Sequence, residues 1–153
     1  MEAASLYHDG VLFHGPRLQG IRRVLRRSEE RSVFECRLPD DHAACAPYAS
    51  VLHRPVLADL LLQVACLQVT WHTGLSCLPL GIGSLEYFAP LPDDATFVVV
   101  VDHPRTTPAS TTVNVTAYTE DGAALSRLTD VAAVGSPGLS ARFVHAAQVG
   151  MHV

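Results

Sequence analysis

Hydrophobic residues follow two different patterns along this chain. Positions 55–73 read PVLADLLLQVACLQVTWHT, a run of about five helical turns in which no glycine and no second proline interrupts the apolar residues. Pro55 is typical of a first helical turn, and Gly74 is typical of the position just after a helix C-terminus. We therefore predict one long helix. Its apolar residues cover most of its circumference, so other structure should enclose it; they are Leu57, Leu60, Leu61, Val64, Leu67 and Trp71.

The remaining segments are typical of strands. After the helix, β-branched residues are abundant, as in FVVVV and TTVNVT, and turn-forming residues divide the sequence into four segments. We predict strands over 78–88, 95–103, 110–120 and 123–134. An antiparallel meander is the simplest way to pair them. One apolar helix with roughly five or six strands predicts an α+β fold, in which a curved sheet wraps around a central helix.

The sequence before the helix is more varied. Residues 32–38 alternate between apolar and polar side chains, as strands do. The spacing of apolar residues from Ile21 is ambiguous, and we predict a further strand there. Gly15-Pro16 excludes a continuous helix over 10–20 and favours an extended segment, a tight turn and a new element. Residues from Leu38 to about position 50 are predicted to form a loop or a short irregular helix.

Composition indicates one well-packed domain over residues 1–153. The chain is 48% hydrophobic and 17% charged, which excludes a disordered segment. Its net charge of −4 argues against a nucleic-acid partner. The most apolar segment carries Asp59, Gln63 and Gln68, so we predict a buried element and no membrane partner. The first ten residues show no basic start followed by an apolar run, and we expect a cytoplasmic location.

The four cysteines, which lack CxxC spacing, are predicted to be reduced core thiols, an interpretation we favour over a metal site. They are Cys36, Cys45, Cys66 and Cys77.

Asp59 and Gln63 are the most informative polar residues. They lie four positions apart on one face of the predicted helix, and Cys66 and Thr70 extend this polar seam. An apolar environment raises the pKa of a carboxyl group, which suits a general acid, and the Gln63 amide would orient the Asp59 carboxyl. Alternatively, Asp59 caps free amides at the helix N-terminus and Gln63 satisfies a neighbour. The residues alone leave both interpretations open.

The sequence Phe13-His14-Gly15-Pro16 forms a second candidate. The rigid turn at Gly15-Pro16 would present His14, or the Gly15 amide, to a ligand carbonyl. A histidine beside a turn is also a common surface residue, so this motif alone is weak.

Together the two features resemble dehydratase domains of polyketide synthases. LFHGPRLQGI at 12–21 resembles the aromatic-Gly-Pro-x-Phe-Gln pattern of the second half of these domains, and PVLADLLLQ at 55–63 resembles their His-Pro-x-Leu-x-Asp-x-x-x-Gln motif. Both motifs occur in the family's order, and LPLGIGSLEYF at 78–88 follows as the next strand does. The resemblance runs over nearly the whole chain.

The resemblance implies a fold and an activity. Such domains are double hot-dogs, and each half is a long helix wrapped in an antiparallel sheet. They remove water from a β-hydroxyacyl chain that is carried on the phosphopantetheine of an acyl carrier protein, so no further cofactor is expected. Carried over, Asp59 is the general acid, Gln63 orients it, and the Gly15-Pro16 turn places the substrate. His14 stands where many members have tyrosine.

Some of the family's features are missing. The family's catalytic base comes from a motif of His, Gly four residues later and Pro five after that, and none of the eight histidines has this spacing. His53 is shifted by one position from the usual His-Pro pair, and Leu18 replaces the usual Phe. The chain is thus similar to the second, C-terminal hot-dog, and a base would come from another chain or from an unexpected histidine.

Three functions follow from these observations. The first is a dehydratase acting on carrier-bound β-hydroxyacyl thioesters, with a homodimer or a complementary N-terminal hot-dog half as partner. The second is a catalytically incomplete half that serves dimerisation or acyl-chain binding. The third is a single-hot-dog thioesterase. Five arginines at 17–27 could meet an acidic carrier protein, although a solvated basic face is the simpler interpretation.

Overall fold

The structure, a computed structural model, describes residues 3–39, 55–91, 94–108 and 110–150. Within these residues, seven strands form one antiparallel sheet: β1 (Ile21–Arg26), β2 (Arg31–Arg37), β3 (Cys77–Gly81), β4 (Ser84–Tyr87), β5 (Thr96–Thr106), β6 (Thr111–Thr119) and β7 (Ala124–Gly135). The helices are α1 (Ala4–His8), α2 (Pro55–Thr73) and α3 (Pro137–Gly150), with a 3-10 turn η1 at Pro16–Leu18. The turn predicted at Gly15-Pro16 is confirmed.

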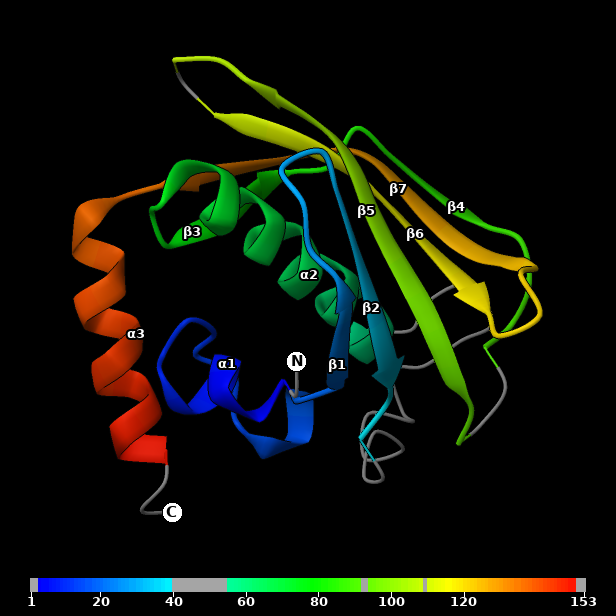
Figure 1. Cartoon of the computed structure of the whole chain (residues 1–153), viewed down its shortest axis with the longest axis horizontal. Helices are drawn as coiled ribbons and strands as arrows, with labels where there is room; N and C mark the ends of the chain where they lie inside the picture. The colour runs from blue at the N-terminus through cyan, green and yellow to red at the C-terminus, as the bar shows by residue number, and fades with distance from the viewer. Residues whose placement is uncertain (1–2, 40–54, 92–93, 109, 151–153) are drawn as a thin grey trace.

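The long helix α2 lies in the curve of the sheet (Figure 1). It begins at Pro55, and Gly74 follows its last residue with φ +73° and its amide donating to the Thr70 carbonyl at 2.8 Å. A residue with a side chain is strained at that φ, which is why glycine suits the position. The predicted helix and its enclosure by the sheet are therefore confirmed.

The predicted meander is confirmed for β5, β6 and β7, which pair in chain order, and it is wrong for the segment at 78–88. β1 also pairs with β2, and the full order is β1-β2-β5-β6-β7-β3. The segment predicted as one strand over 78–88 is divided between β3 and β4, which both pair with β7 and not with β5. After β4, which pairs with β7, the chain therefore crosses the sheet, and β5 pairs with β2.

The division between β3 and β4 has a local cause. The Gly83 amide donates to the Thr129 carbonyl at 3.0 Å, and a Cβ on Gly83 would lie 3.0 Å from the Cβ of Asp130. Asp130 itself has φ +53°, an uncommon conformation for a residue with a side chain. The close approach at this irregular part of β7 interrupts the pairing of 78–88, and Gly83 is the residue that permits it.

Two helices were not predicted from the sequence. α1 is a single short turn, and α3 begins at Pro137 and packs beside α1 (Figure 1). Buried Phe143 of α3 reaches the segment before η1, where its ring centroid lies 4.7 Å from that of Phe13. The N-terminal segment is therefore covered by the last helix of the chain.

The core fills the space between α2 and the concave face of the sheet. The alternating residues of β5 show this directly, since Phe97, Val99 and Val101 are fully buried. By length and composition α2 is the one described helix that could cross a membrane, yet most of it is buried inside the sheet, as in core helices.

Cys36, Cys66 and Cys77 are free and buried, as predicted, whereas Cys45 and most of the predicted 38–50 loop lie outside the described residues.

Candidate active site

The polar seam of α2 faces a cavity of about 280 Å³. Residues before η1, the start of β3 and α3 complete its walls. The predicted seam is thus brought to one cavity together with His14. The polar lining residues are His14, Asp59, Gln63, Cys66, Thr70 and Cys77, and the apolar ones include Val11, Phe13, Leu62, Leu78, Pro79 and Phe143.

Asp59 lies between a histidine and an amide. Its Oδ2 accepts a hydrogen bond from Gln63 Nε2 at 2.7 Å, and its Oδ1 lies 3.7 Å from His14 Nε2. Burial raises the pKa of Asp59, but the neighbouring His14 imidazole and Gln63 amide outweigh burial and hold this pKa below its usual range. The predicted rise in the pKa of Asp59 is therefore wrong, because the side chain is 36% exposed and two donors face it.

Gln63 is held in one orientation. Its side chain is almost fully buried, and its Oε1 accepts a hydrogen bond from the Tyr7 hydroxyl at 3.0 Å. Its Nε2 also donates to the Leu18 carbonyl at 2.8 Å, so the amide nitrogen must face Asp59. Tyr7 in turn accepts from the Ile21 amide at 3.3 Å. Gln63 therefore contacts the Asp59 carboxylate as predicted, and its amide is fixed by α1.

Tyr7 was not identified from the sequence. It is one of four tyrosines, it lies in a short N-terminal helix, and no motif marks it. Burial raises its pKa well above the usual range, so the hydroxyl keeps its proton and donates to Gln63. Only the fold, which packs α1 against α2, reveals its role.

The His14 side chain is 10% exposed, and its ring is stacked on Phe13 with centroids 4.3 Å apart. The buried Nδ1 has no hydrogen-bond partner among the described residues. The His14 carbonyl accepts from Gln19 Nε2 at 2.9 Å, which ties the turn to η1. His14 therefore lies inside the cavity, whereas Gly15 and Pro16 are exposed and do not line it.

Two thiols complete the polar lining. Cys77 Sγ donates to the Cys66 carbonyl at 3.2 Å and lies 3.6 Å from Thr70 Oγ1. Cys66 belonged to the predicted seam, but the contribution of Cys77 from β3 was not predicted. Among the described residues no three His, Cys, Asp or Glu side chains are grouped to hold a metal ion.

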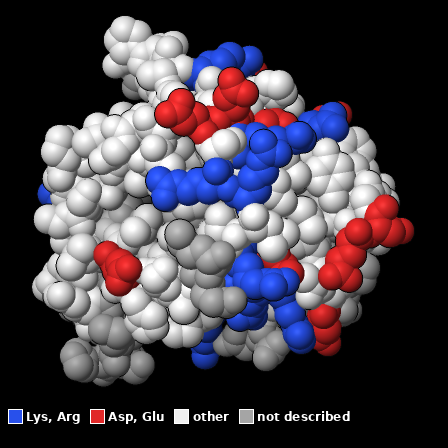
Figure 2. All heavy atoms as spheres, viewed as in Figure 1, with Lys and Arg blue, Asp and Glu red and all other residues white. Residues whose placement is uncertain are grey.

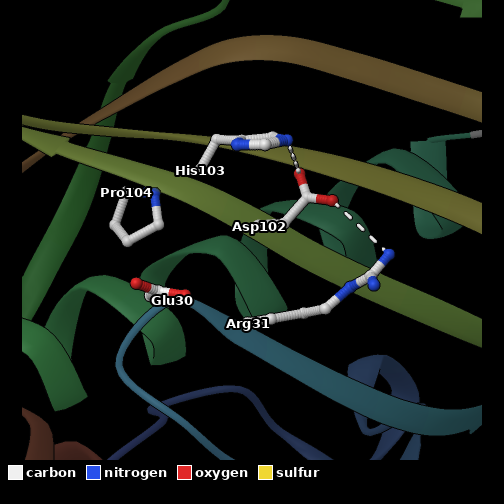
Figure 3. A pocket seen from close by; sticks show the side chains of 5 residues that line it. All are labelled: Glu30, Arg31, Asp102, His103 and Pro104. Atoms are coloured by element: carbon white, nitrogen blue, oxygen red, sulfur yellow. Dashed lines mark ion pairs between the residues drawn. The ribbon is translucent and has the colours of Figure 1, made fainter.

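A second hollow, of about 480 Å³, lies on the opposite part of the sheet and contains none of the predicted site residues. There Asp102 lies between His103 and Arg31, with its carboxylate oxygens 3.8 Å from His103 Nε2 and 3.8 Å from an Arg31 nitrogen (Figure 3). The His103 side chain is 73% exposed. The two hollows thus contain a similar histidine–aspartate pair in different surroundings.

Sequence comparison identifies the family. Residues 2–134 match the family described as "Polyketide synthase dehydratase N-terminal domain", so the chain belongs to this dehydratase family. It is also 35% identical over 103 residues to one of the subunits of a polyunsaturated fatty acid synthase from Thraustochytrium sp. (strain ATCC 26185 / S-3), covering 65% of this chain and 4% of that protein. The family's description names the N-terminal domain, whereas the motifs resemble the second half, so the position within a pair stays a prediction.

Solved structures confirm the hot-dog fold. The dehydratase domains of the CurF and CurK modules of curacin polyketide synthase superpose with TM-scores of 0.69 and 0.68 at 18% and 19% identity. This chain spans about half of each, 48% and 47%, while 89% of it is covered. A hypothetical thioesterase with coenzyme A from Streptococcus pneumoniae TIGR4 superposes at 0.60 and 16% identity, over 74% of this chain and 86% of that one.

Proposed function

We propose that this dehydratase-type domain removes water from β-hydroxyacyl thioesters carried on an acyl carrier protein. The observation that carries the proposal is the cavity in which Asp59, Gln63 and His14 meet. Elimination needs one group that takes a proton from the α-carbon and one that gives a proton to the leaving β-hydroxyl. Asp59 and His14 supply such a pair within this chain.

In the proposed reaction Asp59 remains the general acid and His14 is the base. His14 takes the α-proton, the Cα–Cβ double bond forms, the Cβ–O bond breaks, and Asp59 protonates the hydroxyl, which leaves as water. The products are an enoyl thioester, a carboxylate and an imidazolium. Because the two groups lie 3.7 Å apart, the proton can return from His14 to Asp59, which restores the starting state.

A general acid must carry a proton, whereas the lowered pKa of Asp59 favours its carboxylate. The two agree when the bound substrate changes the solvent exposure of Asp59. In the open cavity the carboxylate is 36% exposed and ionised. An acyl chain would displace water from the cavity, and loss of solvent favours the neutral form of a carboxyl group such as that of Asp59. Substrate binding would thus favour the protonated Asp59 that the elimination requires.

The two ends of the sheet support two different partners, a second hot-dog at the β3 end and an acyl carrier protein at the β1 end. Exposed apolar side chains lie at β3 and just after it, where Leu78, Leu80 and Ile82 are 36%, 68% and 44% exposed. This edge and the half-length match to dehydratase structures support pairing with a second hot-dog, either a copy of this chain or a complementary N-terminal half. Light scattering tests this: a Leu80→Lys variant should lower the mass of a dimer, and a monomeric unmodified chain would contradict self-association.

At the other end, arginine side chains form a stripe across the face in Figure 2. β1, at this end of the sheet, carries the exposed Arg22 and Arg26, and Arg27 follows it with its guanidinium 4.5 Å from the centroid of the Trp71 ring. Arg23 is neutralised by Glu35, with an Nε–Oε1 distance of 2.8 Å. The stripe supports docking of an acidic carrier protein, which complementary charge would accelerate.

The deciding experiment uses the full chain and a 3-hydroxybutyryl-pantetheine thioester, with products identified by mass spectrometry. The enoyl thioester is expected. The match to thioesterases over most of their length favours a second candidate, hydrolysis of the thioester, and release of free 3-hydroxybutyrate would identify it. No product, even with a complementary half added, would instead assign the catalytically incomplete domain.

A further inference from the structure

The imidazole of His14 is held by packing and not by hydrogen bonds. Its buried Nδ1 has no hydrogen-bond partner among the residues that the structure describes. Its Nε2 lies 3.7 Å from Asp59 Oδ1, beyond the usual length of an N–H···O hydrogen bond. A base must nevertheless be held in one position to reach the proton that it takes. The orientation of the His14 ring therefore depends on the side chains that pack against it.

Two phenylalanine rings supply this packing. The Phe13 ring is stacked on the His14 ring, with centroids 4.3 Å apart and an angle of 24° between the planes. Phe13 is itself 40% exposed, so the core does not hold it. The Phe143 ring packs against Phe13 with centroids 4.7 Å apart, and Phe143 is 7% exposed and lines the cavity. Phe143 thus supports the ring on which His14 is stacked.

Phe143 belongs to a helix that follows the part of the chain shared with the dehydratase family. The family match ends at residue 134, before α3 begins. Of the α3 side chains that the structure describes, only that of Phe143 is buried. A helix that contributes one buried side chain, and places it beside Phe13, contributes little else to the core. The main contact of α3 is therefore with the candidate site.

Two further contacts fix where α3 lies. The Ser140 hydroxyl is 2.8 Å from the hydroxyl of Ser76, which stands just before β3. At Gly10, a Cβ would lie 2.7 Å from the Cα of Val144, so the backbones approach closely there. α3 is thus tied both to the β3 side of the cavity and to the N-terminal segment, beside α1 (Figure 1).

We propose that Phe143 is a positioning residue of the candidate site, which holds the His14 imidazole toward Asp59 by packing against Phe13. The chemical role of His14 rests on the proposed function, whereas the effect of Phe143 on the position of the His14 ring does not. Phe143 has no group that exchanges a proton, so its effect on the rate should pass through His14.

The kinetic test uses the full chain and 3-hydroxybutyryl-pantetheine. Phe143→Ala should lower kcat by about tenfold and leave KM unchanged, because the base is misplaced while the acyl chain still binds. Phe143→Leu should recover most of this loss, because an apolar side chain again packs against Phe13. Arg142→Ala, at the exposed neighbouring position of α3, is the matched control and should behave as the unmodified chain. A raised KM with unchanged kcat would show that Phe143 only binds the acyl chain, and would overturn the proposal.

Combination with His14→Gln separates positioning from a general loss of stability. If Phe143 acts through His14, Phe143→Ala should cause no further loss of rate in the His14→Gln chain. A tenfold loss in both backgrounds would mean that α3 supports the fold without positioning His14, and would also overturn the proposal.

A second measurement does not depend on dehydration. In the proton NMR spectrum, the stacked Phe13 ring should shift the His14 ring protons upfield, and the His14→Gln variant, which lacks this signal, assigns it. Phe143→Ala should move the signal toward that of His103, which is 73% exposed, and Arg142→Ala should not. An unmoved signal in Phe143→Ala would overturn the proposal. A moved signal in a chain that forms no enoyl thioester would overturn the proposed function and uphold the positioning of His14.

Discussion

Two histidine–aspartate pairs in this protein have nearly the same spacing, 3.7 Å for His14 and Asp59 and 3.8 Å for His103 and Asp102. The carboxylates are also similarly exposed, at 36% and 28%. The pairs differ in the histidine, which is 10% exposed in one and 73% in the other. Distance between the two groups alone therefore does not define a site.

The third group of each pair differs as well. Asp59 receives a hydrogen bond from the neutral amide of Gln63, whereas Asp102 faces the guanidinium of Arg31. Asp102 thus faces a guanidinium that carries a permanent positive charge. A neutral amide orients Asp59 without adding a charge, and the nearly buried His14 lies 3.7 Å from the same carboxylate. The surroundings, and not the pair itself, create the candidate catalytic centre.

The largest expected effect separates the two aspartates. Asp59→Asn should lower the rate of dehydration of 3-hydroxybutyryl-pantetheine by about 100- to 10,000-fold, because an amide cannot deliver the proton. Asp102→Asn, the matched control, should leave the rate unchanged. Steady-state rates of the two variants measure the difference, and equal rates for them would remove Asp59 from the mechanism.

The two histidines are compared by proton exchange. Butyryl-pantetheine lacks the β-hydroxyl, so in D2O only removal and return of its α-proton can be observed. His14→Gln should slow incorporation of deuterium by about 100-fold, since it removes the base. His103→Gln should exchange at the unmodified rate. If His14→Gln exchanges as fast as the unmodified chain, the base comes from elsewhere.

The sequence predicted the part of the site that one helix carries. Asp59, Gln63, Cys66 and Thr70 share a face because of helical spacing, and Pro55 and Gly74 predicted where that helix begins and ends. Only local periodicity is needed for these predictions. They required no knowledge of what faces the helix.

The residues that face the helix were harder to predict. Cys77 of β3 and Phe143 of α3 line the cavity, and Tyr7 of α1 contacts Gln63. Only non-local packing brings these three residues to α2. The direction of the Asp59 pKa shift was predicted wrongly for the same reason, because it depends on His14, which lies far away in the sequence. The meander was predicted correctly for β5, β6 and β7 but wrongly for the segment at 78–88, which pairs with β7, because strand-like segments do not specify which neighbours they pair with.

A smaller effect is expected at Tyr7. Tyr7→Phe removes the donor to Gln63 Oε1 and the acceptor for the Ile21 amide. We expect the free energy of unfolding to fall by about 1–3 kcal/mol. The dehydration rate should fall by about tenfold, because the Gln63 amide is then free to turn away from Asp59. Urea unfolding and steady-state kinetics measure the two effects.

The control is Tyr118→Phe, at a half-buried position of β6, which should change neither the free energy of unfolding nor the rate appreciably. Loss of stability in Tyr7→Phe without loss of rate would show that Tyr7 supports the fold alone.

The smallest effect concerns the pH dependence of stability. Because the pKa of Asp59 is lower in the folded protein than in the unfolded chain, protonation favours unfolding. This stabilisation is fully present above the usual Asp value of about 3.9 and is lost as the pH falls through the folded-state pKa. The stability difference between the unmodified chain and Asp59→Asn should therefore shrink in acid. A difference that grows as the pH falls would contradict the lowered pKa.

The most direct test of the account is a double-mutant cycle between His14 and Asp59, measured as the dehydration rate of 3-hydroxybutyryl-pantetheine. If the two residues exchange one proton as a unit, His14→Gln combined with Asp59→Asn should be no slower than the slower single variant. The His103 and Asp102 substitutions provide the reference, with no loss singly or together. Losses at His14 and Asp59 that multiply would show two independent groups and contradict the account.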